Sequence, residues 1–221
     1  MNPVALMLAD SRFPGGGHVH SGGLEEAARR GLVSDVPSLG SFLLGRLRTA
    51  GSLAAVFAAA SVSCSDWSTL DAELDARTPS PAQRLASRAQ GRATARAGRH
   101  AWPSPVLDSL LAATPRPHHA VVLGVLTGVA GGSARDAALT AGYLSISGPA
   151  SAAVRLLGLD PFAVNAVVAR LSDELDSVAT HAVAAADLSV ECLPAPGAPG
   201  LDLLAEAHVR HHKEEVRLFA S

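Results

Sequence analysis

The sequence predicts an all-α protein, a single helical domain of about 8–10 helices with a flexible C-terminal tail. Apolar residues recur at helical spacing through most of the chain, whereas alternating, strand-like patterns are short and rare. The chain has two tryptophans, one tyrosine and five phenylalanines, but twenty glycines and many alanines. We therefore expect closely spaced helices whose core consists of many small side chains. A chain of 221 residues can bury such a core without disulfides or metals.

The N-terminal segment predicts two helices joined by a glycine-rich loop. The first helix is expected to end near Asp10, and three glycines at 15–17 give the backbone the freedom to turn. The second helix is expected to be capped by His20-Ser21, with Glu25 near its start, where the helix dipole favours acidic side chains. No Gly-Lys-Ser/Thr ending follows the glycines, so a nucleotide site is not expected.

A long apolar helical segment follows. Pro37 stands where a first helical turn tolerates proline, and Gly51 is placed to kink or divide the segment. The apolar positions at helical spacing are Leu39, Phe42, Leu43, Leu47, Leu53 and Phe57.

The next two helices are expected at Trp67–Ala76 and Pro81–Gly98, separated by the break at residues 78–81. The second carries a row of arginines on one face, which predicts either a solvated helix face or a docking surface for an acidic partner. These arginines are Arg84, Arg88, Arg92, Arg96 and Arg99.

Proline and glycine separate the helices expected in the second half of the chain. His118 and His119 are adjacent and point to different sides of a helix, so each is expected to be a core or capping residue and not a shared metal ligand. The expected helices are Ser104–Ala112, His118–Gly131, Ser133–Leu157 and Pro161–Leu188.

The C-terminal part predicts a division into domain, linker and tail. Residues 1–193 form the helical domain, and residues 194–200 form a linker because three prolines and two glycines cannot sustain a regular element. Residues 201–221 form an amphipathic tail, which is expected to order when it docks on a partner.

Composition argues against several classes of partner. Eighteen basic residues nearly balance twenty acidic ones, and no basic run is interleaved with aromatics, so nucleic acid is not expected as a partner. The uncharged stretches 49–65, 120–133 and 137–154 are diluted by Ser, Thr, Gly or Pro, so they predict core helices and not membrane spans.

The N-terminus lacks the basic region of a signal peptide, and the two cysteines are expected to be small buried thiols. A cytoplasmic location is expected.

One segment carries a specific resemblance. Residues 9–25 read Ala-Asp-Ser-Arg-Phe-Pro-Gly-Gly-Gly-His-Val-His-Ser-Gly-Gly-Leu-Glu. This run resembles the N-terminal motif of urease accessory proteins of the F type, the UreF family, in which His18 stands where Phe or Tyr is usual. The positions that match the motif are Asp10, Ser11, Phe13, Pro14, Gly16, His20, Ser21, Gly23, Leu24 and Glu25.

Weaker resemblance extends over nearly the whole chain. Segments 87–92, 117–124 and 153–157 are similar to family sequences, and the closing residues 217–221 resemble the family ending Arg-Leu-Phe-x-Ser. After Leu157 the family usually has Pro-Leu-Gly-Gln, which is absent here, so no role for those glutamines is carried over.

The resemblance implies a helical, typically dimeric accessory protein that is not an enzyme. Such a protein joins a UreD/UreH-type accessory protein and the UreG GTPase on apo-urease and supports GTP-dependent nickel delivery. No tightly bound cofactor is implied, and contact with Ni²⁺ would be transient. Residues expected to bind partners are His18, His20, Glu25, Arg217, Leu218 and Phe219.

A different class of function stays open at this point. His208, His211 and His212 are spaced to bring three imidazoles to one side of a helix, where Ni²⁺ or Zn²⁺ could bind. The alternative reading is therefore a helical protein that sequesters nickel or zinc through these C-terminal histidines. A polar tail face beside neighbouring glutamates is the simpler interpretation of the same residues.

Overall fold

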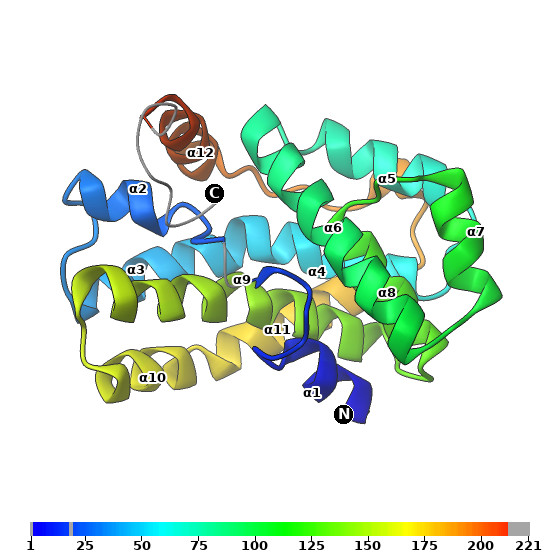
Figure 1. The fold of residues 1–221 in the computed structure, drawn as a ribbon, viewed down its shortest axis with the longest axis horizontal. Helices are drawn as coiled ribbons and strands as arrows, with labels where there is room; N and C mark the ends of the chain where they lie inside the picture. Colours follow the sequence, from blue (N-terminus) through cyan, green and yellow to red (C-terminus); the bar gives the residue numbers. More distant parts are fainter. Residues whose placement is uncertain (1, 18–19, 212–221) are drawn as a thin grey trace.

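The structure is a computed structural model that describes residues 2–17 and 20–211 of the chain (Figure 1). It confirms the all-α prediction, because the described residues form helices and no strand. The first elements are α1 (Pro3–Ala9), α2 (Leu24–Arg29), α3 (Val36–Arg46), η2 (Leu47–Gly51), α4 (Ser52–Ser61), α5 (Trp67–Ala76) and α6 (Pro81–Ala101). The remaining elements are α7 (Pro105–Ala113), α8 (His119–Val129), α9 (Ala134–Leu157), α10 (Pro161–Arg170), α11 (Ser172–Ala185), η3 (Val190–Cys192) and α12 (Pro199–His211).

The long apolar segment forms α3 and α4 with a π-helical turn between them. Asp35 caps α3 through a reciprocal capping box with Ser38, and Pro37 lies in the first turn as expected. The π-helical turn η2 ends at Gly51, the residue that the sequence marks as the division of this segment.

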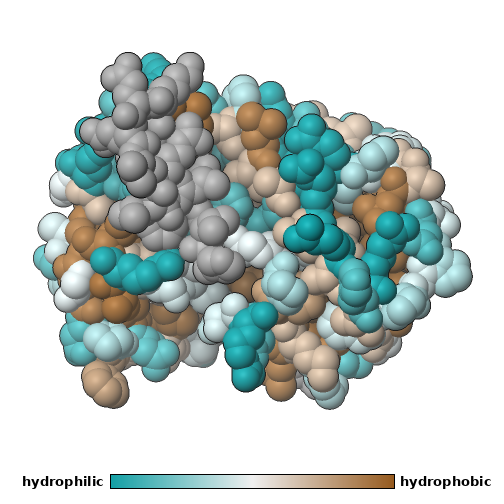
Figure 2. Space-filling model, viewed as in Figure 1, coloured by the Kyte–Doolittle hydropathy of each residue, from teal (hydrophilic) through white to brown (hydrophobic). Residues whose placement is uncertain are grey.

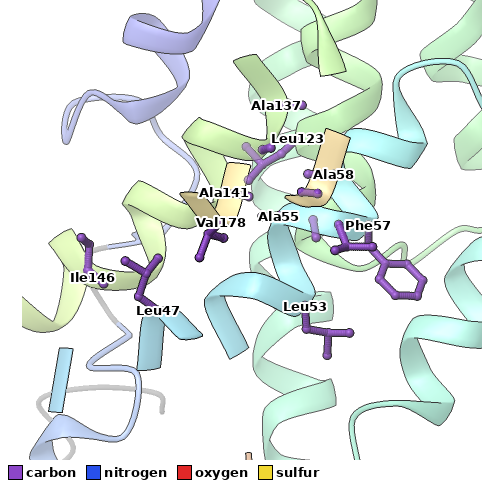
Figure 3. Close-up of a cluster of buried hydrophobic side chains, with 14 of the residues drawn as sticks. Leu47, Leu53, Ala55, Phe57, Ala58, Leu123, Ala137, Ala141, Ile146 and Val178 are labelled. Atoms are coloured by element: carbon purple, nitrogen blue, oxygen red, sulfur yellow. The ribbon is translucent and has the colours of Figure 1, made fainter. Parts of the chain in front are cut away.

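The core is centred on α4, which packs against α8, α9 and α11 (Figure 3). Ala55 and Ala58 of α4 are completely buried, and so is Ala137 of α9, so the helices meet through small side chains. Phe57 is the one large aromatic side chain in this part of the core that is fully buried. The expectation of a core rich in small residues is confirmed.

A single glycine sets the spacing between α8 and α4. A Cβ atom added to Gly124 would collide with the carbonyl oxygen of Ala58, and it would lie 2.5 Å from Cβ of Ser61. The two helices can approach this closely only because residue 124 has no side chain.

The longest described helix, α9, has 24 residues and contains a proline. Ser133 caps its start through a capping box with Asp136, and Pro149 lies in its interior. The following segment, expected as one helix over 161–188, divides into α10 and α11 around Leu171.

The C-terminal segment differs from the expected linker and tail, because regular structure resumes within the expected linker. Helix α12 begins at Pro199, because proline is tolerated at the first position of a helix, and it packs against α2 and α6. The two cysteines also differ from expectation, since Cys64 is half-buried and Cys192, the last residue of η3, is exposed.

Among the described helices, the segment Val36–Ser61 alone is long and apolar enough to cross a membrane. Half of its apolar window, 50%, is buried inside the molecule.

Candidate functional site

The described residues of the motif, 10–17 and 20–25, lead from the end of α1 into the first turn of α2, and we call residues 10–25 the signature segment. Asp10 ends α1, and its carboxylate accepts hydrogen bonds from the backbone N–H (2.8 Å) and the guanidinium of Arg12. These hydrogen bonds lower the pKa of Asp10 to about 2. The hydrogen bond from the Arg12 backbone N–H forms a local turn directly after α1.

The middle of the signature segment lies over α6. The ring of Phe13 stacks on Trp102 with the ring centroids 6.3 Å apart, and Gly15 lies against the Thr94 side chain. Beneath the loop is a pocket of about 780 Å³ between α1, α6, α8 and α9. Its lining includes Phe13, Gln90, Thr94, His119, Tyr143 and Arg155.

The part of the signature segment that leads into α2 contacts α8 and α9. Burial, with a contribution from His20, lowers the pKa of His119 to about 4, so His119 is neutral at physiological pH. Ser21 is completely buried, and its Oγ accepts a long hydrogen bond of 3.4 Å from Glu25 N. The helix cap expected at His20-Ser21 instead falls on Gly23, which has a positive φ of 90°.

Helix α2 carries two adjacent glutamates that face α12. The side chain of Glu25 is 12% exposed, and its Oε2 lies 4.0 Å from Nδ1 of His208, which is itself buried. Glu26 is fully buried and forms ion pairs with Arg29 (2.8 Å) and Arg30 (2.7 Å). These charged partners, Arg29 first, lower the pKa of Glu26 to about 2.

Two acidic residues attach α12 to the start of α6. Oε1 of Glu206 accepts hydrogen bonds from Oγ of Ser80 (2.6 Å) and from the backbone N–H of Ala82 (3.0 Å). Oδ1 of Asp202, one turn earlier, accepts a bond of 3.0 Å from the side-chain amide of Gln83. The helix dipole favours negative charge at this position, so α12 docks electrostatically as well as through its apolar face.

The docked helix brings the C-terminal region beside the signature segment. In Figure 1 α12 lies next to α2, although the two helices come from opposite ends of the chain. Sequence reasoning missed Asp202 and Glu206 as docking residues. Their i, i+4 spacing, together with buried Leu204 and His208 at i and i+4, was the available signal.

The predicted partner-binding residues are only partly within the described chain. His20 and Glu25 lie in the signature segment as described above. His18, Arg217, Leu218 and Phe219 fall outside the described residues, so their assignment stays a prediction.

The predicted metal ligands contact different groups. His208 is buried facing Glu25, whereas Nδ1 of His211 lies 3.3 Å from Glu26 and 2.7 Å from the guanidinium of Arg29. His212 lies outside the described residues. Within residues 2–17 and 20–211, no cluster of three or more His, Cys, Asp or Glu side chains could hold a metal ion. The cationic neighbour of His211 disfavours binding of a second cation there.

The row of arginines on α6 divides into two groups and Arg99, which pairs with Asp108 of α7 at 2.5 Å. Arg84 and Arg88 turn towards α5, and Arg88 pairs with Asp71 (2.9 Å) and Asp75 (2.7 Å). Arg92 and Arg96 are exposed, and hydrophilic residues follow this face of the molecule in Figure 2. The row is therefore partly an internal ion-pair network and partly a solvated face.

His118 belongs to this network and confirms the expectation of a capping residue. It stands at the N-cap of α8, and its backbone N–H donates to Asp71 at 2.7 Å. Its ring nitrogens lie 3.0 Å from Ser87 Oγ and 3.0 Å from Asp75 Oδ1. Burial lowers the pKa of His118 despite these acidic neighbours.

Comparison with known proteins identifies relatives of the whole chain. The family model of UreF matches residues 33–172. The urease accessory protein UreF of Mycolicibacterium vanbaalenii is 48% identical over 98% of this chain and 97% of that protein. The proteins of the same name from Mycobacterium bovis (strain BCG / Pasteur 1173P2) and Mycobacterium tuberculosis (strain ATCC 25618 / H37Rv) are 46% and 45% identical, each over 99% of this chain and 98% of the relative.

Proposed function

The chain belongs to the UreF family of urease accessory proteins, and from this premise we propose that it works as a non-enzymatic scaffold in urease maturation. It joins a UreD/UreH-type accessory protein and the UreG GTPase on apo-urease, and the assembly delivers nickel in a GTP-dependent step. The protein acts in the cytoplasm as a homodimer. Ni²⁺ is a cargo that contacts it transiently and not a resident cofactor.

The observation that carries the proposal is the position of α12 beside the signature segment. Glu25 faces His208, and Glu206 accepts hydrogen bonds at the start of α6, so α12 is held on the domain from two sides. Helix α12 therefore ends beside α2, where Nδ1 of His211 lies 3.3 Å from Oε1 of Glu26. Glu25, which the family resemblance assigns to partner binding, thus lies beside the last described helix of the chain.

Co-purification with tagged partners tests the scaffold. The full chain is compared with a chain that ends at His211, which lacks residues 212–221 but keeps all of α12, and with Arg217→Ala. Both variants are expected to keep the melting temperature of the full chain, because both retain every described helix up to the end of α12 at His211. Both are expected to lose most of the GTPase from the complex. Undiminished recovery of every partner would refute the role of the tail.

Calorimetry with Ni²⁺ separates the scaffold from a metal-sequestering protein. The variant with His208, His211 and His212 all changed to Ala removes the three predicted ligands. The variant His211→Ala/His212→Ala removes two of them and leaves buried His208 in place. A scaffold is expected to show weak binding that changes little in either variant. Loss of tight binding in both variants would favour sequestration of nickel or zinc.

A further inference from the structure

Arg46, at the end of α3, joins three segments that are distant in sequence. Its Nε donates a hydrogen bond of 2.7 Å to the carbonyl oxygen of Ser145 in α9. Its Nη1 donates a second bond of 2.7 Å to the carbonyl oxygen of Gly22 in the signature segment. One guanidinium therefore connects α3, α9 and the turn that leads into α2.

The acceptor in α9 is the carbonyl that Pro149 leaves without its normal donor. In an α-helix the N–H of residue 149 would donate to the carbonyl of residue 145, but proline has no N–H. The guanidinium of Arg46 supplies the missing donor from outside the helix. A buried carbonyl without any donor would destabilise the fold, so the bond has a structural role as well.

The acceptor in the signature segment is held in a conformation that suits glycine. Gly22 has a positive φ of 62°, and a Cβ atom there would lie 2.8 Å from Cζ of Arg46. The guanidinium thus packs directly against the backbone of this turn. The next residue, Gly23, is the N-cap of α2, and the carbonyl of His20 lies against Gly148 one residue before the proline.

The guanidinium has no acidic partner within the described chain. Both of its hydrogen bonds go to backbone carbonyls, and burial alone lowers the pKa of Arg46 to about 10, so the group stays charged at neutral pH. Burial of a charge without a carboxylate costs free energy, and an apolar residue of similar size would avoid that cost. The planar guanidinium is suited to this place because it can donate to two carbonyls in different directions at once.

We propose that Arg46 is a positioning residue that holds the Gly22–Gly23 turn, and with it His20 and Glu25, in the geometry that a partner protein recognises. The inference rests on the proposed scaffold function and adds a residue that touches no partner itself. Pro149 is part of this arrangement, because it leaves the Ser145 carbonyl oxygen free to accept a hydrogen bond from the guanidinium.

The proline makes it possible to separate the structural role of Arg46 from its positioning role. Arg46→Met removes the donor from both carbonyls. Pro149→Ala restores an N–H that can donate to the Ser145 carbonyl within α9. The double variant Arg46→Met/Pro149→Ala therefore repairs the helix but leaves the Gly22 carbonyl without its donor, and Pro149→Ala alone is the matched control.

Three measurements are made on each variant, namely the melting temperature, the exchange of backbone amides, and co-purification with tagged accessory proteins. Arg46→Met is expected to lower the melting temperature, and the double variant is expected to recover most of that loss. The amides of Leu24 and Ala27, which bond to Ser21 and Gly23, are expected to exchange about tenfold faster in both variants, as loss of a charge-assisted hydrogen bond predicts. Capture of partners is expected to fall about tenfold in both.

Arg46→Lys serves as a milder variant if Arg46→Met does not fold, because its ammonium can still donate to one carbonyl. It is expected to give intermediate exchange and capture. If exchange and capture recover together with the melting temperature in the double variant, Arg46 only completes α9 and the inference is wrong. If exchange rises while capture is unchanged, the inference is also wrong. If the unaltered chain captures no partner, the scaffold proposal fails independently of the exchange result.

Discussion

The carboxylate of Glu26 is fully buried in α2, yet it stays ionised because three cationic or hydrogen-bonding groups surround it. Arg29 and Arg30 pair with it from its own helix, and His211 approaches it from α12 at 3.3 Å. The two arginine side chains are 46% and 44% exposed, so their charges remain partly solvated while the carboxylate is enclosed. Ionisation of Glu26 therefore contributes to folding and to the docking of α12.

We predict that Glu26→Gln destabilises the protein in a pH-dependent way. The folded-state pKa is about 2, below the ordinary value of 4.5, so the stabilisation is complete above about pH 4.5 and is lost as the pH falls towards 2. The shift corresponds to at most about 3 kcal/mol, and screening at the exposed arginines brings the expected loss nearer 1–2 kcal/mol. Urea denaturation at a series of pH values measures this loss in the free energy of unfolding.

The matched control for this prediction is Glu191→Gln, because Glu191 is exposed. It is expected to change the free energy of unfolding by no more than about 0.5 kcal/mol at any pH. A loss in Glu26→Gln that is equally large at pH 3 and pH 7 would show that packing of the side chain, and not its charge, is what matters.

At the scale of elements, α12 is held by an arrangement that resembles an anion bound at a helix N-terminus. Its apolar side places Leu204 and Ala207 in the interior, and its carboxylates at 202 and 206 reach the first turn of α6. Hydrogen bonds from Ser80 and Ala82 lower the pKa of Glu206, whereas burial raises the pKa of Asp202. Of the two, Glu206 is therefore the residue whose charge contributes more to docking.

We predict that Glu206→Gln loosens α12 without unfolding the domain. The amide can still accept hydrogen bonds from Ser80 and Ala82, but the charge at the start of α6 is lost, which costs about 1 kcal/mol. Amides of 199–211 are expected to exchange faster, while those of α8 and α9 keep their protection. Leu203→Ser is the control, because Leu203 is 67% exposed on the same helix. Equal effects of the two variants would contradict electrostatic docking.

At the scale of the whole molecule, the fold was predictable because its signals are local. The 3–4 spacing of apolar residues located the helices, and proline or glycine marked most of their ends, as at Pro81 and Gly158. The division of 161–188 at Leu171 was missed because neither proline nor glycine stands there. At the π-helical turn before Ser52, the sequence predicted a kink or division at Gly51 but not the π-helical form of the turn.

The site was less predictable because its contacts join residues distant in sequence. The motif located the signature segment, but nothing local connects Arg46 with Ser145, 99 residues away. The proline at 149 indicates a carbonyl oxygen without its helical hydrogen-bond donor, but the sequence does not indicate which side chain supplies a donor instead. In the same way, the amphipathic pattern of 201–211 indicated a helix that docks, and the structure supplies α2 and α6 as the surfaces on which it docks.

The close spacing of helices across the molecule gives the last prediction, in which one substitution type has opposite effects at two glycines. Gly124→Ala is expected to destabilise by about 3 kcal/mol, because the added methyl group would collide with the Ala58 carbonyl and push α8 away from α4. Gly45→Ala, in α3, meets no atom within 4 Å and is expected to stabilise by about 0.5–1 kcal/mol through helix propensity. Urea denaturation of both variants measures the two changes. If Gly124→Ala were as stable as Gly45→Ala, a methyl group would fit between α4 and α8. The absence of a side chain at residue 124 would then not be what sets the spacing of these helices.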